Sequence, residues 1–191
     1  HLGFLTEVEL NDLFAEIGCL KEDKFFIDTR MMLEAKVLRG NKFSQTFLAL
    51  NDVVITKGPF ARLIRLKAYS NDAYIDTYPA DGLIVSTPTG STAYSLSAGG
   101  PIIDPNMELL LMTPICPHTL QSRSIVLSKE DIIKVELMED FTEALLTVDG
   151  QVGFELTPGD KIYIKKSTYS TKLMRFKQRS FYDILRKKLT E

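Results

Sequence analysis

The sequence predicts a mainly β fold in which antiparallel sheets pack on one another, as in a β-sandwich. Strand-like runs recur at short spacing, turn dipeptides such as Asp-Gly and Asn-Asp separate them, and few segments have helical periodicity. A doubly wound parallel sheet would place a helix between successive strands, and this pattern is absent. The expected strands occupy residues 46–56, 62–70, 74–78, 83–86, 125–127, 132–138, 144–148, 161–165 and 172–176.

Both ends of the chain predict helices. Thr6 and Glu9 have the spacing of a capping box, and Gly18 stands where a helix would end. Between them, apolar residues recur at helical spacing: Leu10, Leu13, Phe14 and Ile17. From residue 25 the period changes to two, which predicts a long strand through residue 37. An amphipathic segment at 181–189 predicts the last helix.

Length and composition indicate one globular domain over residues 1–191. The 45% hydrophobic and 25% charged content is ordinary for a folded domain. Cys19 and Cys116 are the two cysteines and form no CxxC pair, which favours reduced thiols in a cytoplasmic protein and no structural zinc. The longest apolar run, 109–116, contains Pro114 and is too short to span a membrane, and no signal-peptide pattern opens the chain.

Charge is distributed unevenly along the chain. Residues 161–191 contain ten basic and two acidic residues, a balance of +8, whereas the first 160 residues carry −10. This basic end is either a phosphate-attracting tail or a solvated face that neutralises acidic neighbours. It lacks the dense aromatic residues of a nucleic-acid surface, so no nucleic-acid partner is expected.

The segment TPTGSTAYSLSAGGP, residues 87–101, is the most informative part of the sequence. Pro88 and Gly90 predict a tight turn, Thr89 or Ser91 is expected to cap a short helix through residue 97, and a glycine pair ends it. Such a helix start presents free N–H groups and hydroxyls to anions or polar nucleotide groups. The alternative is an ordinary loop and helix cap.

Order and context make this segment specific. With LGFLTEV at 2–8, LND at 50–52, ADG at 80–82, STPTGSTAYSLSAGGPI at 86–102 and VDGQ at 148–151, the chain resembles the NAD kinase family from end to end. The resemblance implies an enzyme that phosphorylates the adenosine ribose 2'-hydroxyl of NAD to make NADP. The phosphate donor would be ATP or polyphosphate, with a divalent cation such as Mg²⁺.

The resemblance covers the C-terminal domain of that family. The family's GGDGT segment, whose Asp is taken as the catalytic base, is absent, so this chain is expected to bind NAD without catalysing transfer. No residue of this sequence is therefore a candidate catalytic residue, and none is a candidate metal ligand. The resemblance further implies a homo-oligomer, a dimer or tetramer, with sites shared between subunits.

Candidate binding residues follow from the matched motifs. Asn51 and Asp52 match a pair that contacts the NAD adenosine, since an amide and a carboxylate can pair with adenine and ribose groups. Asp81 matches an acidic position that engages the nicotinamide half, often from a neighbouring subunit. The remaining candidates line the dinucleotide or lie near it: Arg62, Thr89, Thr92, Ala93, Tyr94, Ser97, Asp149 and Gln151.

Four of these residues also have a structural interpretation. Asn51 and Asp52 could form an Asx turn, Asp81 an Asp-Gly turn, and Tyr94 could be a half-buried helix aromatic. Pro79 replaces a basic residue that many relatives have two positions before Asp81.

Three alternative functions compete with this interpretation. The chain could be a non-catalytic module that binds NAD or NADP, or a lipid kinase domain of the diacylglycerol or sphingosine type. Against the lipid kinase stand the full TPTGSTAYSLSAGGP string and its polar lining. His118 with Ser91 or Ser95 suggests a serine hydrolase, but no GxSxG elbow is present.

Overall fold

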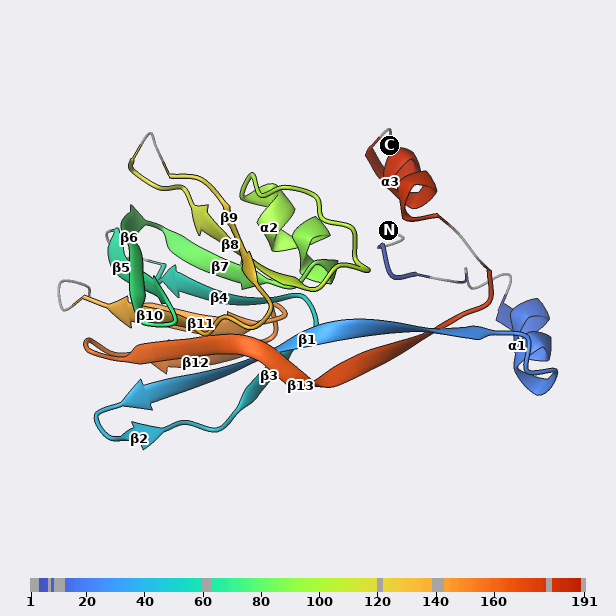
Figure 1. Cartoon of the computed structure of the whole chain (residues 1–191), viewed down its shortest axis with the longest axis horizontal. Helices are drawn as coiled ribbons and strands as arrows, with labels where there is room; N and C mark the ends of the chain where they lie inside the picture. Colours follow the sequence, from blue (N-terminus) through green and yellow to red (C-terminus); the bar gives the residue numbers. More distant parts are fainter. Residues whose placement is uncertain are drawn as a thin grey trace. The chain divides into compact units, whose positions relative to one another are not determined.

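The computed structural model describes residues 4–6, 8, 13–59, 63–119, 122–138, 143–177 and 180–189. It divides the chain into two compact units (Figure 1). The larger unit is Met31–Ser170, and the smaller unit combines His1–Arg30 with Thr171–Glu191.

Two antiparallel sheets form the larger unit, which confirms the mainly β prediction (Figure 1). The first sheet has the strand order β2-β1-β13-β10-β5-β6, with β3 paired to β1. Its strands are β1 (Phe26–Arg39), β2 (Lys42–Phe43), β3 (Phe47–Ala49), β5 (Ile64–Ser70), β6 (Ala73–Ala80), β10 (Ile133–Leu137) and β13 (Lys161–Arg175). The second sheet has the order β12-β11-β4-β7-β8-β9. Its strands are β4 (Asp52–Lys57), β7 (Gly82–Ser86), β8 (Leu109–Ile115), β9 (Ile125–Ser128), β11 (Ala144–Val148) and β12 (Val152–Leu156).

A single apolar core lies between the two sheets. Alternate residues of each strand point into it, for example Leu33 and Ala35 from β1 and Val53 and Ile55 from β4. The other face of the second sheet carries a smaller cluster of Val54, Ile84 and Ile115, against which Ala98 packs. Because Ala98 directly follows helix α2 (Tyr94–Ser97), this helix lies on part of the outer face of the second sheet, beside β7 (Figure 1).

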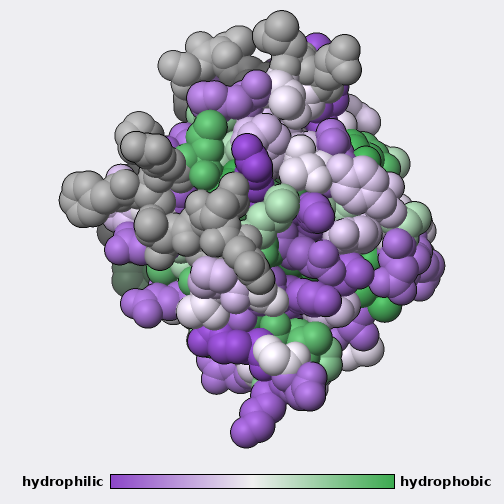
Figure 2. Space-filling view, turned by 90° about the vertical axis from the view of Figure 1, so that its left-hand side faces the viewer, coloured by the Kyte–Doolittle hydropathy of each residue, from purple (hydrophilic) through white to green (hydrophobic). Residues whose placement is uncertain are grey.

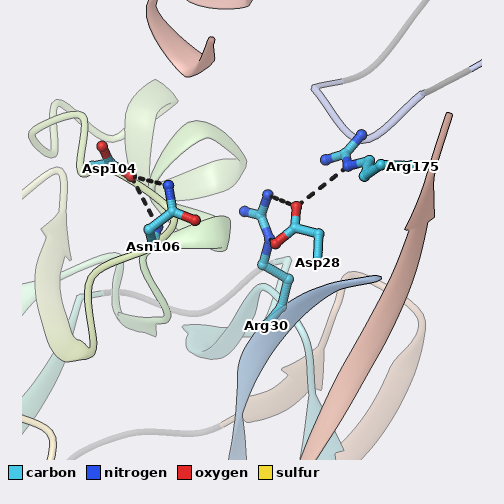
Figure 3. Close-up of polar contacts among 5 residues, drawn as sticks. All are labelled: Asp28, Arg30, Asp104, Asn106 and Arg175. Carbon is cyan, nitrogen blue, oxygen red and sulfur yellow. Dashed lines mark hydrogen bonds and ion pairs between the residues drawn. The ribbon is translucent and has the colours of Figure 1, made fainter. Parts of the chain in front are cut away.

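The smaller unit contains helices α1 (Leu13–Lys21) and α3 (Phe181–Leu189). Its polar centre is Asp28, on which Arg30 and Arg175 converge (Figure 3). Burial alone would raise the pKa of Asp28, but hydrogen bonds and charges of both arginines outweigh burial and lower it. The two arginines and Asp28 therefore fasten the beginning of β1 to the end of β13.

The predicted last helix is confirmed, and the first one is corrected. Gly18 lies inside α1 and does not end it, while Glu9 and Leu10 fall outside the described residues. The helical spacing predicted that Phe14 lies on a buried face of this helix. The structure leaves the Phe14 side chain 86% exposed within its own unit.

Several strand predictions also change. The run 46–56 forms two strands, β3 and β4, because Leu50 and Asn51 between them are not in a strand. The runs at 161–165 and 172–176 belong to one strand, β13. Strands β2, β8 and β12 were not predicted. Strand β8 is buried along its whole length and therefore has no alternating pattern; it holds Pro114 in register with Leu83.

The surface is mostly polar where Figure 2 shows it. On this face, apolar described residues form small separate groups among hydrophilic ones. Among the helices of the described ranges, none has the length and apolar character required to cross a membrane.

Candidate functional site

The site lies at one end of the β4–β7 pair, where β4 begins and β7 ends. These strands pair antiparallel, with Asp52 opposite Ser86 at one end. Beyond that pair, the backbone N–H of Thr87 donates to the carbonyl of Asn51 at 2.9 Å, and the Thr87 hydroxyl donates to the carbonyl of Leu50 at 2.6 Å. The chain before β4 and the chain after β7 are thus held together.

Two short helices follow, in place of the single helix that was predicted. A 3₁₀ helix, η2 (Thr89–Thr92), and α2 are separated at Ala93, whose ψ of −129° is not helical. Neither Thr89 nor Ser91 caps the first turn through its side chain; Pro88 occupies the N-cap position. The hydroxyl of Thr87 accepts the N–H of Gly90 at 3.0 Å, so the side chain that satisfies this turn lies one residue earlier.

Ser91 has an internal role in this turn. Its hydroxyl is fully buried, donates to the carbonyl of Pro88 at 2.7 Å and accepts the N–H of Ile103 at 3.0 Å. These bonds tie η2 to the segment after the glycine pair. The next residues of that segment form an Asx turn, in which Asp104 accepts two hydrogen bonds from Asn106 (Figure 3).

Gly90 brings η2 into close contact with Asn51, the residue directly before β4. A Cβ at this position would collide with the backbone carbonyl of Asn51. Only glycine lets the turn approach Asn51 this closely, because any side chain would displace one of the two backbones.

Asp149 fixes the conformation of residues 50–52. It lies in the turn between β11 and β12 with a φ of +49°. Its carboxylate accepts the backbone N–H groups of Leu50, Asn51 and Asp52 at 2.8, 2.7 and 3.1 Å. Asp149 therefore presents the side chains of Asn51 and Asp52 in one fixed register.

Asp52 is a buried carboxylate with an unusual titration. It is 4% exposed, and burial together with the nearby charge of Asp149 raises its pKa to about 6, although a hydrogen bond from the backbone of Tyr94 lowers it. A carboxyl group in this state accepts further donors readily, since each new hydrogen bond to the ionised form offsets the cost of burial.

The accessible side of the site carries the polar and aromatic groups of η2, α2 and the start of β4. Tyr94 is 44% exposed, and Asn51 is half-buried with no hydrogen bond from its side chain to the described residues. The structure therefore groups seven of the predicted residues around the meeting point of β4 and β7: Asn51, Asp52, Thr89, Thr92, Ala93, Tyr94 and Asp149.

Thr89 is buried and supports the turn, whereas Thr92 and Ala93 are half-buried and Ser97 is exposed one helical turn beyond Tyr94.

Two predicted residues lie elsewhere, and one falls outside the described residues. Asp81 directly precedes β7, whereas Asp52 lies opposite Ser86 at the far end of that strand. Five residues of strand correspond to about 17 Å. Asp81 forms an ion pair with Lys57 at 2.8 Å. Gln151 is exposed in the turn that contains Asp149. Arg62 falls outside the described residues.

The serine hydrolase and metal alternatives receive no support from the described residues. Ser91 and Ser95 are fully buried, and the Ser95 hydroxyl is bonded to that of Thr113 at 3.0 Å, whereas His118 is exposed on the chain after β8. In the same described part of the chain, no three His, Cys, Asp or Glu side chains gather as a metal site.

The sequence pattern does not single out Thr87, which builds the site through its bonds to Leu50 and Gly90. A signal exists for its neighbour Ser86, because a hydroxyl at the end of an apolar run breaks the pattern of a fully buried strand.

The fold and site define a nucleotide-kinase domain, as comparisons with known proteins show. The family model described as the ATP-NAD kinase C-terminal domain matches residues 50–176. The whole chain is 53% identical to the NAD kinase of Caldanaerobacter subterraneus subsp. tengcongensis and 52% identical to that of Thermoanaerobacter sp. strain X514, and spans 68% of each. The chain therefore belongs to the NAD kinase family, which confirms the resemblance seen in the sequence.

Solved structures agree with this assignment. The yeast NADH kinase complexed with NADH superposes with a TM-score of 0.91 at 26% identity, over 100% of this chain and 57% of that one. An NAD kinase from Archaeoglobus fulgidus in complex with ATP gives a TM-score of 0.80 at 25% identity, over 98% of this chain and 70% of that one.

Proposed function

We propose that this chain forms the NAD-binding part of an enzyme that transfers a phosphoryl group from ATP or polyphosphate to the adenosine ribose 2'-hydroxyl of NAD. The observation that carries the proposal is the fixed pair of Asn51 and Asp52, held by Asp149 beside the exposed ring of Tyr94. The relatives named above support the substrate, since they are NAD kinases and a structural neighbour holds NADH.

Each group at the site has a distinct task in this proposal. The amide of Asn51 pairs with the adenine edge, and the carboxylate of Asp52 accepts hydroxyls of the adenosine ribose. The ring of Tyr94 stacks on the base, and Thr92, Ala93 and Ser97 line the dinucleotide. Asp149 acts as a positioning residue, because its carboxylate is already occupied by three backbone donors.

We assign no catalytic base to this chain. Phosphoryl transfer needs a group that orients the attacking hydroxyl and a cluster of positive charge around the transferred phosphoryl. The described residues at the site offer hydroxyls, amides and one buried carboxylate. In this proposal a divalent cation such as Mg²⁺ arrives bound to the phosphate donor, and the chain contributes orientation of the ribose.

The distant position of Asp81 supports a shared site. Since Asp81 lies at the other end of β7 from Asp52, it would reach a dinucleotide bound to a neighbouring subunit in a dimer or tetramer. Gln151 is assigned to the rim of the site formed by Asn51 and Asp52, because it lies in the same turn as Asp149. Arg62, outside the described residues, is proposed as a binding residue on the motif match alone. We also propose a cytoplasmic location, where both free cysteines would stay reduced.

Ligand-dependent melting tests the binding function. At 100 times the dissociation constant, NAD or NADP should stabilise the protein by about 2.7 kcal/mol, a rise of about 5 to 11 °C in melting temperature for a domain of this size. Absence of a shift with either nucleotide, together with a shift in the presence of a lipid headgroup, would favour the lipid kinase alternative.

Turnover distinguishes an enzyme from a pure binding module. The full-length protein incubated with NAD, ATP and Mg²⁺ should form NADP, measured by a coupled dehydrogenase assay. Binding of NAD without formation of NADP, with either ATP or polyphosphate, would identify a non-catalytic module.

A further inference from the structure

One buried polar group in the larger unit has no use in the site described so far. The hydroxyl of Ser86 is fully buried, and among the described residues it is the only buried side-chain nitrogen or oxygen without a hydrogen-bond partner. Leaving a hydroxyl unsatisfied away from water costs about 1 to 3 kcal/mol, so such groups call for a specific explanation.

The strand register shows which groups face Ser86. Val54 and Ile84 point to the outer face of the second sheet, and by the two-residue period of a strand so do Asp52 and Ser86. Ser86 has two direct cross-strand neighbours, Asp52 on β4 and Leu111 on β8. Leu111 is apolar, so Asp52 is the one polar side chain directly opposite the Ser86 hydroxyl.

The geometry of an antiparallel pair brings these two side chains within reach. Directly opposed residues have Cβ atoms about 4.5 to 5.5 Å apart, a separation that a serine hydroxyl and a carboxylate can close by rotation about their side-chain bonds. The hydroxyl of Thr113, two residues from Leu111 on β8, is already bonded to that of Ser95 at 3.0 Å.

Asp52 has acceptor capacity to spare. An ionised carboxylate offers about four lone-pair sites, and the interaction that lowers its pKa is a single hydrogen bond from the backbone of Tyr94. Among the described residues, the charged group that acts on Asp52 is the Asp149 carboxylate, from the β11–β12 turn, and the backbone of Tyr94 in α2 donates to it. Strand β7 and helix η2 contain no charged residue. An uncharged donor from β7 is therefore the natural complement for the ionised form.

We propose that Ser86 is a positioning residue of the NAD site, whose hydroxyl donates to the ionised carboxylate of Asp52 when the nucleotide is bound. One carboxylate oxygen is then held by the protein, and the other is directed at the ribose hydroxyls. This inference rests on the proposed function, because it assigns Asp52 to the ribose.

The test is a double-mutant cycle on NAD affinity in the full-length protein, measured by calorimetry. At pH 8, Ser86→Ala should raise the dissociation constant for NAD about tenfold, the effect of losing one hydrogen bond to a charged group. Ser86→Cys, which keeps a weaker donor in a slightly larger side chain, should give a dissociation constant between those of the wild-type protein and Ser86→Ala. In an Asp52→Ala background, Ser86→Ala should change the constant by less than twofold, since no acceptor side chain remains opposite the hydroxyl.

Ser95→Ala is the matched control. It also removes one fully buried hydroxyl, here from helix α2, but one that is bonded to Thr113 on the second sheet. It should lower the melting temperature and leave NAD affinity at both pH 8 and pH 5 unchanged. For Ser86→Ala, the loss of affinity should shrink at pH 5, where Asp52 is protonated.

The outcomes separate the inference from the function on which it rests. If the wild-type protein binds NAD and Ser86→Ala binds within twofold at pH 8, or if its loss persists in the Asp52→Ala background, the positioning role is wrong. If the wild-type protein does not bind NAD at all, the proposed function itself is wrong.

Discussion

Asp149 and Asn51, 98 residues apart in the sequence, are joined by a 2.7 Å hydrogen bond from the Asn51 backbone N–H to the Asp149 carboxylate. The same carboxylate holds Leu50 and Asp52. The turn between β11 and β12 therefore sets the backbone from which the proposed adenosine contacts project.

Asp149→Ala should release this backbone. Three N–H groups lose their acceptor, and alanine is strained at the φ of +49°, so the free energy of unfolding should fall by about 2 kcal/mol or more, with NAD affinity reduced. Urea denaturation and calorimetry measure the two effects. Asp72→Ala is the control, because Asp72 has a φ of +67° but, among the described residues, accepts a hydrogen bond from Lys134 alone. Equal losses in both variants would attribute the effect to strain alone.

Gly90→Ala should separate η2 from Asn51, at the beginning of β4. The new Cβ would collide with the carbonyl of Asn51, so one backbone must move, and both stability and NAD affinity should fall. Overpacking of this kind costs about 1 to 3 kcal/mol. Gly18→Ala in helix α1 meets no described atom within 4 Å and should instead stabilise the protein by about 1 kcal/mol. Thermal melting of both variants decides, and a neutral Gly90→Ala would show that the close approach is dispensable.

The titration of Asp52 predicts a pH-dependent stability. Its pKa rises from 3.8 in the unfolded chain to about 6 in the folded protein, so the folded state binds more protons between these values. The free energy of unfolding therefore falls as the pH rises from about 4 to 6. Above that range it stays about 3 kcal/mol lower than it would be with an unshifted pKa for Asp52.

Asp52→Asn should remove this cost. In the absence of NAD, the variant should be more stable than the wild-type protein at pH 8 and nearly equal to it at pH 4, in urea denaturation at each pH. A stability difference that is the same at both values would show that burial does not shift the pKa of Asp52.

Tyr94→Ala should weaken NAD binding without unfolding the protein. The ring is 44% exposed, so its removal should change stability by less than about 0.5 kcal/mol, whereas loss of stacking on the base costs about 1 to 3 kcal/mol. Tyr94→Phe should bind NAD nearly as well as the wild-type protein. Tyr169→Ala, at a tyrosine that is 67% exposed on β13, is the control for loss of an exposed ring. A Tyr94→Ala variant that melts early would indicate a packing role.

The sequence was sufficient for the fold class and for the segments with a clear period. The alternation in residues 31–37 and the turn pairs between strands are local sequence patterns, and each predicts its structure without information from the rest of the chain. The alternating burial of β1 and the antiparallel sheets agree with these predictions. Strand β8 could not be found in this way, because a strand buried on both faces loses its alternation and Pro114 argues against it.

The site was predicted in part for a similar reason. The motif indicated the residues around Tyr94, but the contacts that assemble them are non-local. The bonds from Asp149 to residues 50–52 and from Thr87 to Leu50 depend on sheet pairing, which no local pattern specifies. The cap of the 3₁₀ helix was misplaced because Thr87, Thr89 and Ser91 are chemically equivalent in sequence.

Gly82, the first residue of β7, has a consequence for how the second sheet can assemble. A side chain on Gly82 would strike the carbonyl of Ile55, so β7 touches the backbone of β4 at this point. A slide of two residues between these strands would keep every apolar side chain on its proper face, yet it would bring Ala80 or Ile84, each with a Cβ, to this tight contact. Steric exclusion thus rejects a misalignment that hydrophobic burial tolerates, and it keeps Asp52 opposite Ser86.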